Sequence, residues 1–255
     1  MKEIITFLMR YVPRPLLIRF SYIFNKMAPV LMKGDKVECP ICNHHFRSFL
    51  PYGTVKRRDN VLCPSCLSLE RHRLLWLFLR EKTNFFTEKT DLLHIAPEQC
   101  FYKRFRKMEN INHLTADLES PLADVHMDIH EMPFETNRFD AILCNHVLEH
   151  VEDDAKAMSE LYRVLKPGGW AIMQVPLDDT RETTYEDPSI TRPEDREIHF
   201  WQKDHVRLYG LDYPKKLEKA GFRVQAIDLG KEFSPEQSQR YRLMEGEIIF
   251  WCHKN

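Results

Sequence analysis

The sequence lacks the segments that would place a chain in or across a membrane. No uncharged apolar run approaches the roughly 18 residues that a spanning helix requires. Charged residues interrupt every signal-like apolar stretch near the start, and no small-residue cleavage site follows. A cytoplasmic protein is therefore expected, with contact at a membrane surface as an alternative.

The sequence also has almost no net charge, but its two halves differ. Residues 1–90 carry 16 Lys and Arg against 7 Asp and Glu, whereas residues 111–255 carry 17 against 28. The length of 255 residues fits one large domain, alone or with a small module. The asymmetry indicates either two units with different partners or a basic segment docked on an acidic domain.

Residues 1–35 combine apolar side chains with scattered arginines and lysines, and Pro13 and Pro15 interrupt them. This pattern predicts a pair of short amphipathic basic helices. They are expected either to lie on an anionic membrane surface or to pack on the body of the protein.

Cys39, Cys42, Cys63 and Cys66 form two C-x2-C pairs, and each pair is written CPxC. Two such knuckles present four thiolates in a tetrahedron, the preferred geometry of Zn²⁺. Because all four ligands come from the protein, the predicted ion is structural, within a zinc module over residues 36–70. The residues between the pairs include Arg47, Lys56, Arg57 and Arg58 together with Phe46, Phe49 and Tyr52. Such a composition can bind RNA, although exposed basic loops are usually only solvated.

The centre of the chain predicts a strand, a helix and a second strand. Residues 139–145 and 170–177 are short, mostly apolar runs typical of strands buried in a parallel sheet. Between them, apolar residues recur at helical spacing through Leu165, after acids at 152–154. Residues 166–169, KPGG, then end the helix, so one right-handed βαβ unit follows.

This block, from MDIHEMPFETNRFDAILCNHVLEH to LKPGGWAIMQVP, resembles the class I methyltransferases that use S-adenosylmethionine, of the type 11-like branch. The resemblance covers about residues 90–255. It implies a Rossmann-like α/β fold, a seven-stranded mostly parallel sheet with helices on both faces, over residues 71–255. A helix over 67–83 is expected to lead into this sheet.

The resemblance also implies cofactor-binding residues, with one departure from the family's pattern. At the first strand the family has an acid and a glycine-rich turn, whereas this chain has His94 in the acidic position and Ala96, Glu98 and Cys100 in the glycine positions. Pro97 is expected to redirect the turn and to open a helix over 98–108. Glu98 is expected to bind the ammonium group of the methionine moiety, or to be only an acid in a helix's first turn.

Further along, the resemblance places Asp117, with Leu118 beside it, on the ribose hydroxyls at the end of a second strand. It places Asp128, Ile129 and His130 at the adenine, and Cys144, Asn145 and His146 at the end of the strand 139–145. Only six residues separate Leu118 from the strand 125–129, too few for a helical crossover, so the family's second helix should be reduced or missing.

His146 and His150 are the candidate general bases, and a structural or cofactor-contacting role is the alternative for each. Residues 178–206 are polar and lack core periodicity, which predicts a substrate lid. It carries the aromatic and histidine side chains Tyr185, His199, Phe200, Trp201 and His205. A helix over 211–220 and a closing antiparallel hairpin of strands 222–229 and 246–254 complete the predicted domain.

The sequence thus predicts a methyltransferase that uses S-adenosylmethionine and carries a structural zinc. The acidic domain and aromatic lid favour a small-molecule or lipid-linked methyl acceptor. The basic zinc module instead resembles that of ribosomal RNA guanine methyltransferases, which implies an RNA acceptor. The missing glycines motivate a third hypothesis, a catalytically silent scaffold of the same fold.

Overall fold

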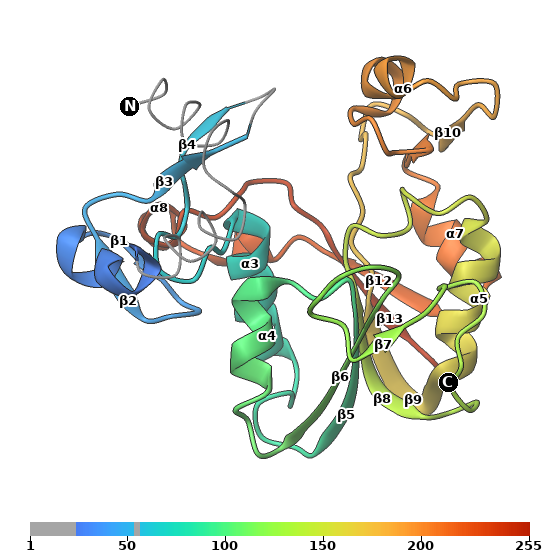
Figure 1. Ribbon diagram of the computed structural model, residues 1–255, viewed down its shortest axis with the longest axis horizontal. Helices are drawn as coiled ribbons and strands as arrows, with labels where there is room; N and C mark the ends of the chain where they lie inside the picture. Colours follow the sequence, from blue (N-terminus) through green and yellow to red (C-terminus); the bar gives the residue numbers. More distant parts are fainter. Residues whose placement is uncertain (1–23, 54–56) are drawn as a thin grey trace. The chain divides into compact units, whose positions relative to one another are not determined.

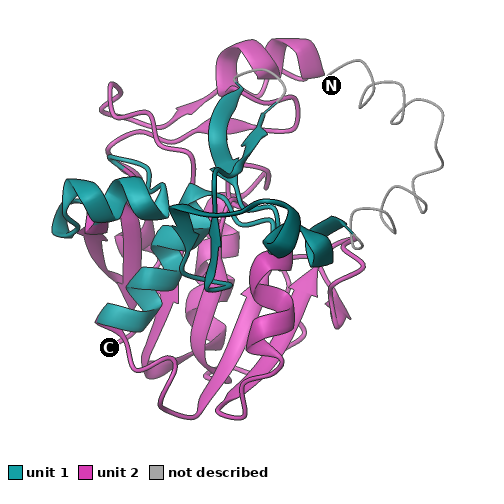
Figure 2. Cartoon of the chain, turned by 90° about the vertical axis from the view of Figure 1, so that its left-hand side faces the viewer, with its two compact units in different colours: residues 1–81, 230–246 teal, residues 82–229, 247–255 magenta. Residues whose placement is uncertain are grey.

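The computed structural model describes residues 24–53 and 57–255. The chain divides into two compact units: unit 1 takes residues 1–81 and 230–246, and unit 2 takes residues 82–229 and 247–255 (Figure 2). Of the amphipathic helices predicted over residues 1–35, the part over 1–23 lies outside the described residues, and so does Lys56. Within the described part of the chain, no helix is long and apolar enough to cross a membrane.

Unit 2 contains a seven-stranded sheet in the order β12-β13-β9-β8-β5-β6-β7 (Figure 1). Five neighbouring strands, β9 through β7, run parallel, and β13 pairs antiparallel with both β9 and the edge strand β12. The strands are β5 Thr90–Ile95, β6 Ile111–Asp117, β7 Val125–His126, β8 Phe139–Cys144, β9 Leu165–Ile172, β12 Arg223–Ile227 and β13 Ile249–His253. The predicted class I methyltransferase architecture is confirmed.

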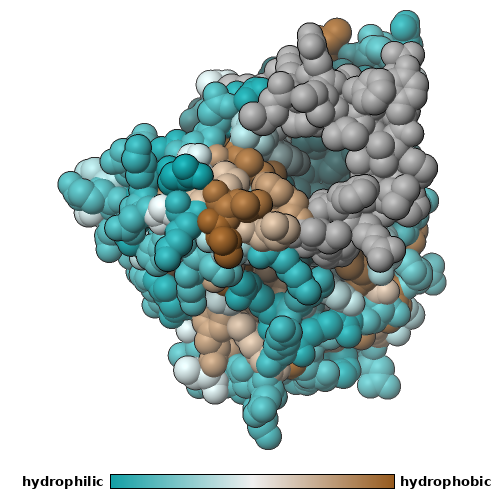
Figure 3. All heavy atoms as spheres, turned by 60° about the vertical axis from the view of Figure 1, so that its left-hand side comes forward, coloured by the Kyte–Doolittle hydropathy of each residue, from teal (hydrophilic) through white to brown (hydrophobic). Residues whose placement is uncertain are grey.

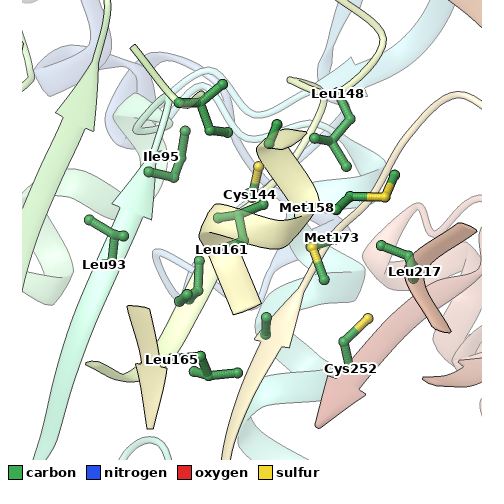
Figure 4. Close-up of a cluster of buried hydrophobic side chains, with 14 of the residues drawn as sticks. Leu93, Ile95, Cys144, Leu148, Met158, Leu161, Leu165, Met173, Leu217 and Cys252 are labelled. Atoms are coloured by element: carbon green, nitrogen blue, oxygen red, sulfur yellow. The ribbon is translucent and has the colours of Figure 1, made fainter. Parts of the chain in front are cut away.

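Helices cover both faces of this sheet. Helix α4 (Gln99–Phe105) lies on one face, and α5 (Asp154–Val164) and α7 (Tyr213–Lys219) lie on the other (Figure 1). Asp153 caps α5 by accepting a hydrogen bond from the backbone nitrogen of Lys156. Met158 and Leu161 of α5 meet Leu93, Ile95 and Cys144 of the sheet in the main core (Figure 4). His94, between Leu93 and Ile95, instead packs against Phe101 and Phe105 of α4. Successive residues of β5 thus point to opposite faces of the sheet.

Two details of the strands differ from the prediction. Strand β9 begins at Leu165, which was expected to end the preceding helix, and it ends at Ile172. Its pairing with β8 slips between Phe139 and Ala141, so residues 166–169 form a bulge within the strand. Gly168 supplies the left-handed backbone that this bulge requires, with φ of +78°. The KPGG stretch thus lies inside the strand instead of only preceding it.

The connections around the sheet also bear on the predictions. No helix lies between β6 and β7, as the short spacing indicated. The segment 178–206 carries β10 (Tyr185–Glu186) and α6 (Pro193–Phe200), and β10 pairs with β11 (Arg207–Leu208) just beyond it. The predicted closing strands β12 and β13 do pair, but they are not joined by a tight hairpin, because residues 230–246 leave unit 2 between them.

Unit 1 is built from two small hairpins and helices. Strands β1 (Lys33–Cys39) and β2 (His44–Phe46) form one hairpin, and β3 (Leu50–Tyr52) and β4 (Arg58–Leu62) form the other. Helix α3 (Glu70–Lys82) follows, and α8 (Pro235–Tyr241), from the segment 230–246, packs near β1. Both α3 and this C-terminal segment thus group with the cysteine module, whereas the sequence prediction placed them in a domain over 71–255.

A buried arginine holds unit 1 together. The side chain of Arg73, on α3, is fully buried. Its guanidinium donates hydrogen bonds to four backbone carbonyls, those of Val61, Ser68, Tyr241 and Arg242, at 2.6 to 2.9 Å. These bonds link the second hairpin, the second knuckle and the C-terminal segment.

Candidate functional site

The loop after β5 turns without a glycine. Ala96 has φ of +49°, in the left-handed region that glycine normally occupies, and its nitrogen donates to the carbonyl of Ala116 at 2.9 Å. Glu98 then takes the N-cap position of α4 without a side-chain capping bond, and Cys100 is buried inside that helix. One of the three expected glycine positions therefore needs a glycine-like backbone here, and alanine adopts it at a cost of about 1 kcal/mol.

The Glu98 side chain is oriented from two sides. One carboxylate oxygen accepts a hydrogen bond from Asn145 Nδ2 at 3.1 Å, and the other contacts His94 Nε2. His94 is fully buried, and its Nδ1 lies 3.2 Å from His113 Nε2. Burial lowers the pKa of His113 to about 3, so its imidazole is neutral. A chain of donors from His113 through His94 to Glu98 follows, which requires Nε2 to carry the proton on both rings.

At the ends of β6 and β7 the predicted ribose and adenine residues lie in two turns. Asp117 ends β6, and its Oδ1 accepts from the backbone nitrogens of Glu119 and Ser120 at 2.8 and 2.7 Å. Among the described residues nothing donates to Oδ2, which leaves that oxygen for a ligand. Leu118 beside it is 66% exposed.

The Asp128 carboxylate, past β7, accepts from both the backbone nitrogen and Nδ1 of His130, at 2.8 and 2.6 Å. The backbone bond from His130 is the main cause that lowers the pKa of Asp128. Ile129, between them, is buried. Asp128 and His130 are thus held as a pair, with a buried apolar residue beneath.

The end of β8 carries the last predicted group. Cys144 is fully buried, and burial raises the pKa of its thiol. Asn145 is buried, and its Oδ1 has no hydrogen-bond donor within the described part of the chain. His146 has φ of +55°, and its nitrogen donates to Gln174 O at 2.7 Å. The polar members of this group therefore lie at the carboxyl ends of parallel strands, where open sheets of this kind bind ligands.

The two candidate bases lie next to other polar groups. His146 Nδ1 is 3.3 Å from the buried carboxylate of Glu149, and His150 Nδ1 is 3.3 Å from the carboxylate of Asp204. The ring of His205, from the predicted lid, packs against that of His150 at 4.7 Å. Sequence reasoning did not identify the grouping of Glu149 with His150 and His205, although all three stood within the motif and the lid.

In unit 1 the four predicted cysteines do come together. Their sulfur atoms lie within 4.8 Å of one another, with Cys39–Cys66 and Cys42–Cys63 both at 3.6 Å. Zinc–sulfur bonds of about 2.3 Å give a tetrahedron with edges of about 3.8 Å, so the spacing fits the ion. Without a cation, the hydrogen bond of Cys39 raises the pKa of Cys42 and of Cys63. A divalent cation is what would let all four sulfurs be thiolates together.

Residues 93–173 match a family model described as a methyltransferase domain. They include the end of β5, the loop at Ala96, Asp117, Asp128 and β8. This segment is a methyltransferase domain.

Curated relatives match short stretches of the chain. An uncharacterised methyltransferase of Schizosaccharomyces pombe is 36% identical over 31% of this chain and 26% of its own length. A demethylmenaquinone methyltransferase of Staphylococcus epidermidis is 41% identical over 23% of this chain and 24% of its own length. The chain thus spans about a quarter of the length of the curated relatives that it matches.

Among solved structures, the [4+2]-cyclase SpnF is similar in fold. The likeness covers 92% of this chain and 95% of that one, with a TM-score of 0.51 and 13% identity. At this identity the similarity concerns the fold alone.

Proposed function

We propose that the chain is a methyltransferase that uses S-adenosylmethionine, bound at the carboxyl ends of β5 to β8. The observation that carries the proposal is the placement of oriented carboxylates at successive strand ends. Glu98 is held by His94 and Asn145, and Asp117 is held by its own turn. Such fixed carboxylates suit the ammonium and the ribose hydroxyls of that cofactor.

We assign the methionine end of the cofactor to the loop after β5, in spite of the missing glycines. Ala96 has only a methyl side chain, and its left-handed backbone turns the loop as glycine would. The buried Asn145 Oδ1, which lacks a donor among the described residues, is a polar atom that a ligand could satisfy. His94 is buried behind Glu98, so we assign it a positioning role through that carboxylate.

When bound, the cofactor supplies a methyl group on a sulfonium, which transfers by in-line displacement. The chain then has to orient the acceptor and, for a weakly nucleophilic acceptor, to remove a proton. His146 is the proposed base, because its Nδ1 faces the Glu149 carboxylate, which would stabilise the imidazolium formed. His150 is the second candidate. The segment 178–206 is the proposed lid over the acceptor.

A small-molecule or lipid-linked acceptor has more support than RNA. The similarity to a demethylmenaquinone methyltransferase favours it, as far as a match over 58 residues can. In unit 1, the described basic residues between the knuckles are engaged locally: Arg47 with Leu31 O, Arg57 with Asp59, and Arg58 with Glu70. Phe46 and Phe49 are buried and cannot stack on bases. Thiolate ligands also require a reducing compartment, so a cytoplasmic location belongs to the proposal.

The test is calorimetric titration of S-adenosylmethionine into wild type, Asp117→Ala and Glu119→Ala. Asp117→Ala removes charge-assisted hydrogen bonds of about 1.5–3 kcal/mol each before competition by water, so affinity should fall at least tenfold. Glu119→Ala, an exposed acid two residues away, should bind as wild type does. An unchanged dissociation constant for Asp117→Ala would sink the assignment, and no binding by wild type would favour the silent scaffold.

The fold itself does not decide the reaction, since SpnF is described as a cyclase. Methyl transfer to quinone-like acceptors and RNA binding at increasing salt should therefore be measured in parallel. RNA affinity that falls steeply with salt would favour the RNA acceptor.

A further inference from the structure

A second group of metal-binding side chains lies beside the strand-end site, in unit 2. Glu149, His150 and His205 each bring one ligand atom within 4.8 Å of the others. Two of the residues follow β8, and the third precedes β11 at the end of the predicted lid. The cysteine module and the residues proposed to hold the cofactor do not include this group. Two of its members do lie next to the proposed chemistry, because Glu149 faces His146 and His150 is the second candidate base.

The Glu149 carboxylate is buried without a hydrogen-bond donor. Its residue is 1% exposed, and neither oxygen accepts a hydrogen bond from any residue that the structure describes. The nearest cationic candidate is His146, whose Nδ1 lies 3.3 Å from one oxygen. Because a buried ionised carboxylate is stable only when it is paired or coordinates a metal, this group calls for a cation.

His205 is oriented as a metal ligand. It is 1% exposed, and its Nδ1 lies 2.8 Å from the carbonyl oxygen of Phe200. Because a carbonyl oxygen can only accept, Nδ1 must carry the proton of the neutral ring. Its Nε2 therefore carries the lone pair, and this buried atom has no partner among the described residues. A histidine that donates one ring nitrogen to a carbonyl and presents the other is the usual second-shell arrangement at metal sites.

His150 is arranged in the same way. Its Nδ1 lies 3.3 Å from both the backbone carbonyl and the carboxylate of Asp204, which leaves Nε2 for a ligand. The backbone around the group is also fixed, because Val206 N donates to Glu149 O at 2.9 Å and Arg207 donates to Leu148 O at 2.8 Å. Two imidazoles and a carboxylate are thus held together before any ion binds.

We propose that Glu149, His150 and His205 bind a divalent transition-metal ion of the Zn²⁺ class. Two histidines and one glutamate form a ligand set that zinc accepts with a fourth position open to water or substrate. The ion would link the end of the lid, at His205, to the loop that carries His146. His150 would then be a ligand and no longer a candidate base. Glu149, which lies 3.3 Å from His146 Nδ1, would face both the ion and the remaining candidate base.

The test is metal content, which does not depend on cofactor binding or activity. Wild type, saturated with Zn²⁺ and dialysed, should hold two zinc ions per chain, one at the cysteines and one at this group. Glu149→Gln and His205→Gln should each hold one, because the zinc affinity of the altered group should fall at least tenfold while the cysteine site is unchanged. His199→Gln, an exposed lid histidine outside the group, is the matched control and should hold two.

A measurement on wild type covers the case in which a variant fails to fold. Co²⁺ added to protein whose cysteine site is filled with Zn²⁺ should produce visible d–d absorption without a thiolate charge-transfer band. One zinc per chain in wild type, with no such Co²⁺ signal, would overturn the proposal and indicate that a protonated histidine balances Glu149. Two zinc ions retained in both folded variants would overturn it as well.

Discussion

Replacing Arg73 by leucine should strongly destabilise unit 1. The bonds from Arg73 to Val61 O and Ser68 O are fully buried, whereas those to Tyr241 O and Arg242 O are partly buried. Leucine would leave two carbonyls that water cannot reach, at about 1–3 kcal/mol each. Burial lowers the pKa of Arg73, which shows that the buried charge itself carries a cost that leucine would avoid. We therefore expect the free energy of unfolding to fall by about 3 kcal/mol in total.

The assay is zinc release during urea unfolding, followed with a chromogenic chelator, because metal binding is coupled to folding of the module. With slopes of about 1–3 kcal/mol per molar urea, the midpoint should fall by about 1–3 M. Arg73→Lys keeps the charge but not the planar guanidinium, so its midpoint should lie between those of wild type and Arg73→Leu. Arg240→Leu removes a half-exposed arginine that pairs with Glu38 in the same unit, and it should barely move the midpoint. Equal midpoints for Arg73→Leu and Arg240→Leu would refute the reasoning.

Three further predictions concern the zinc, the cofactor and pH. Protein purified without chelator should contain one thiolate-bound zinc, which Cys63→Ser abolishes; a folded, reduced wild type without zinc by elemental analysis would contradict this. Glu98→Gln should weaken S-adenosylmethionine more than an analogue that lacks the amino group, and equal losses by calorimetry would remove the ammonium role from Glu98. Burial lowers the pKa of His113 to about 3, against about 6.5 in the unfolded chain, so between these pH values only the unfolded chain holds the proton. The contribution of His113 to stability should therefore be complete above about pH 6.5 and fall as pH drops toward 3, by at most about 1.4 kcal/mol per pH unit. In His113→Gln the denaturation midpoint should depend less on pH over this range.

The apolar residues on the surface bear on the predicted N-terminal helices. Most of the visible surface is hydrophilic, with apolar residues gathered in a few places (Figure 3). Within unit 1, the helix over 24–31 exposes Phe24, Met27, Val30 and Leu31. The amphipathic helices, and the choice between membrane surface and protein body, stay predictions.

Local patterns were sufficient for the main strands of the sheet in unit 2 and for α5. Short apolar runs such as 139–145 have the length of strands buried on both faces, and the steps of three and four residues in α5 favour a helix. The boundary at Leu165 failed, because an apolar residue next to a KPGG bulge suits the end of a helix and the start of a strand equally well. The segment 230–246 was missed for a related reason, since α8 buries none of its residues and so carries no core periodicity.

By itself the sequence determined the two C-x2-C cysteine pairs, the order of the main sheet strands of unit 2, and the acids at the end of β6 and just past β7. Each of these depends on residues close together in the chain, where spacing fixes geometry. Only the tertiary structure decided that Arg73 meets the carbonyls of residues 241 and 242, and that His205 meets Glu149 and His150. Such contacts join segments far apart in sequence, and the burial that leaves Glu149 without a donor is a property of the packed chain, because desolvation depends on every neighbour at once.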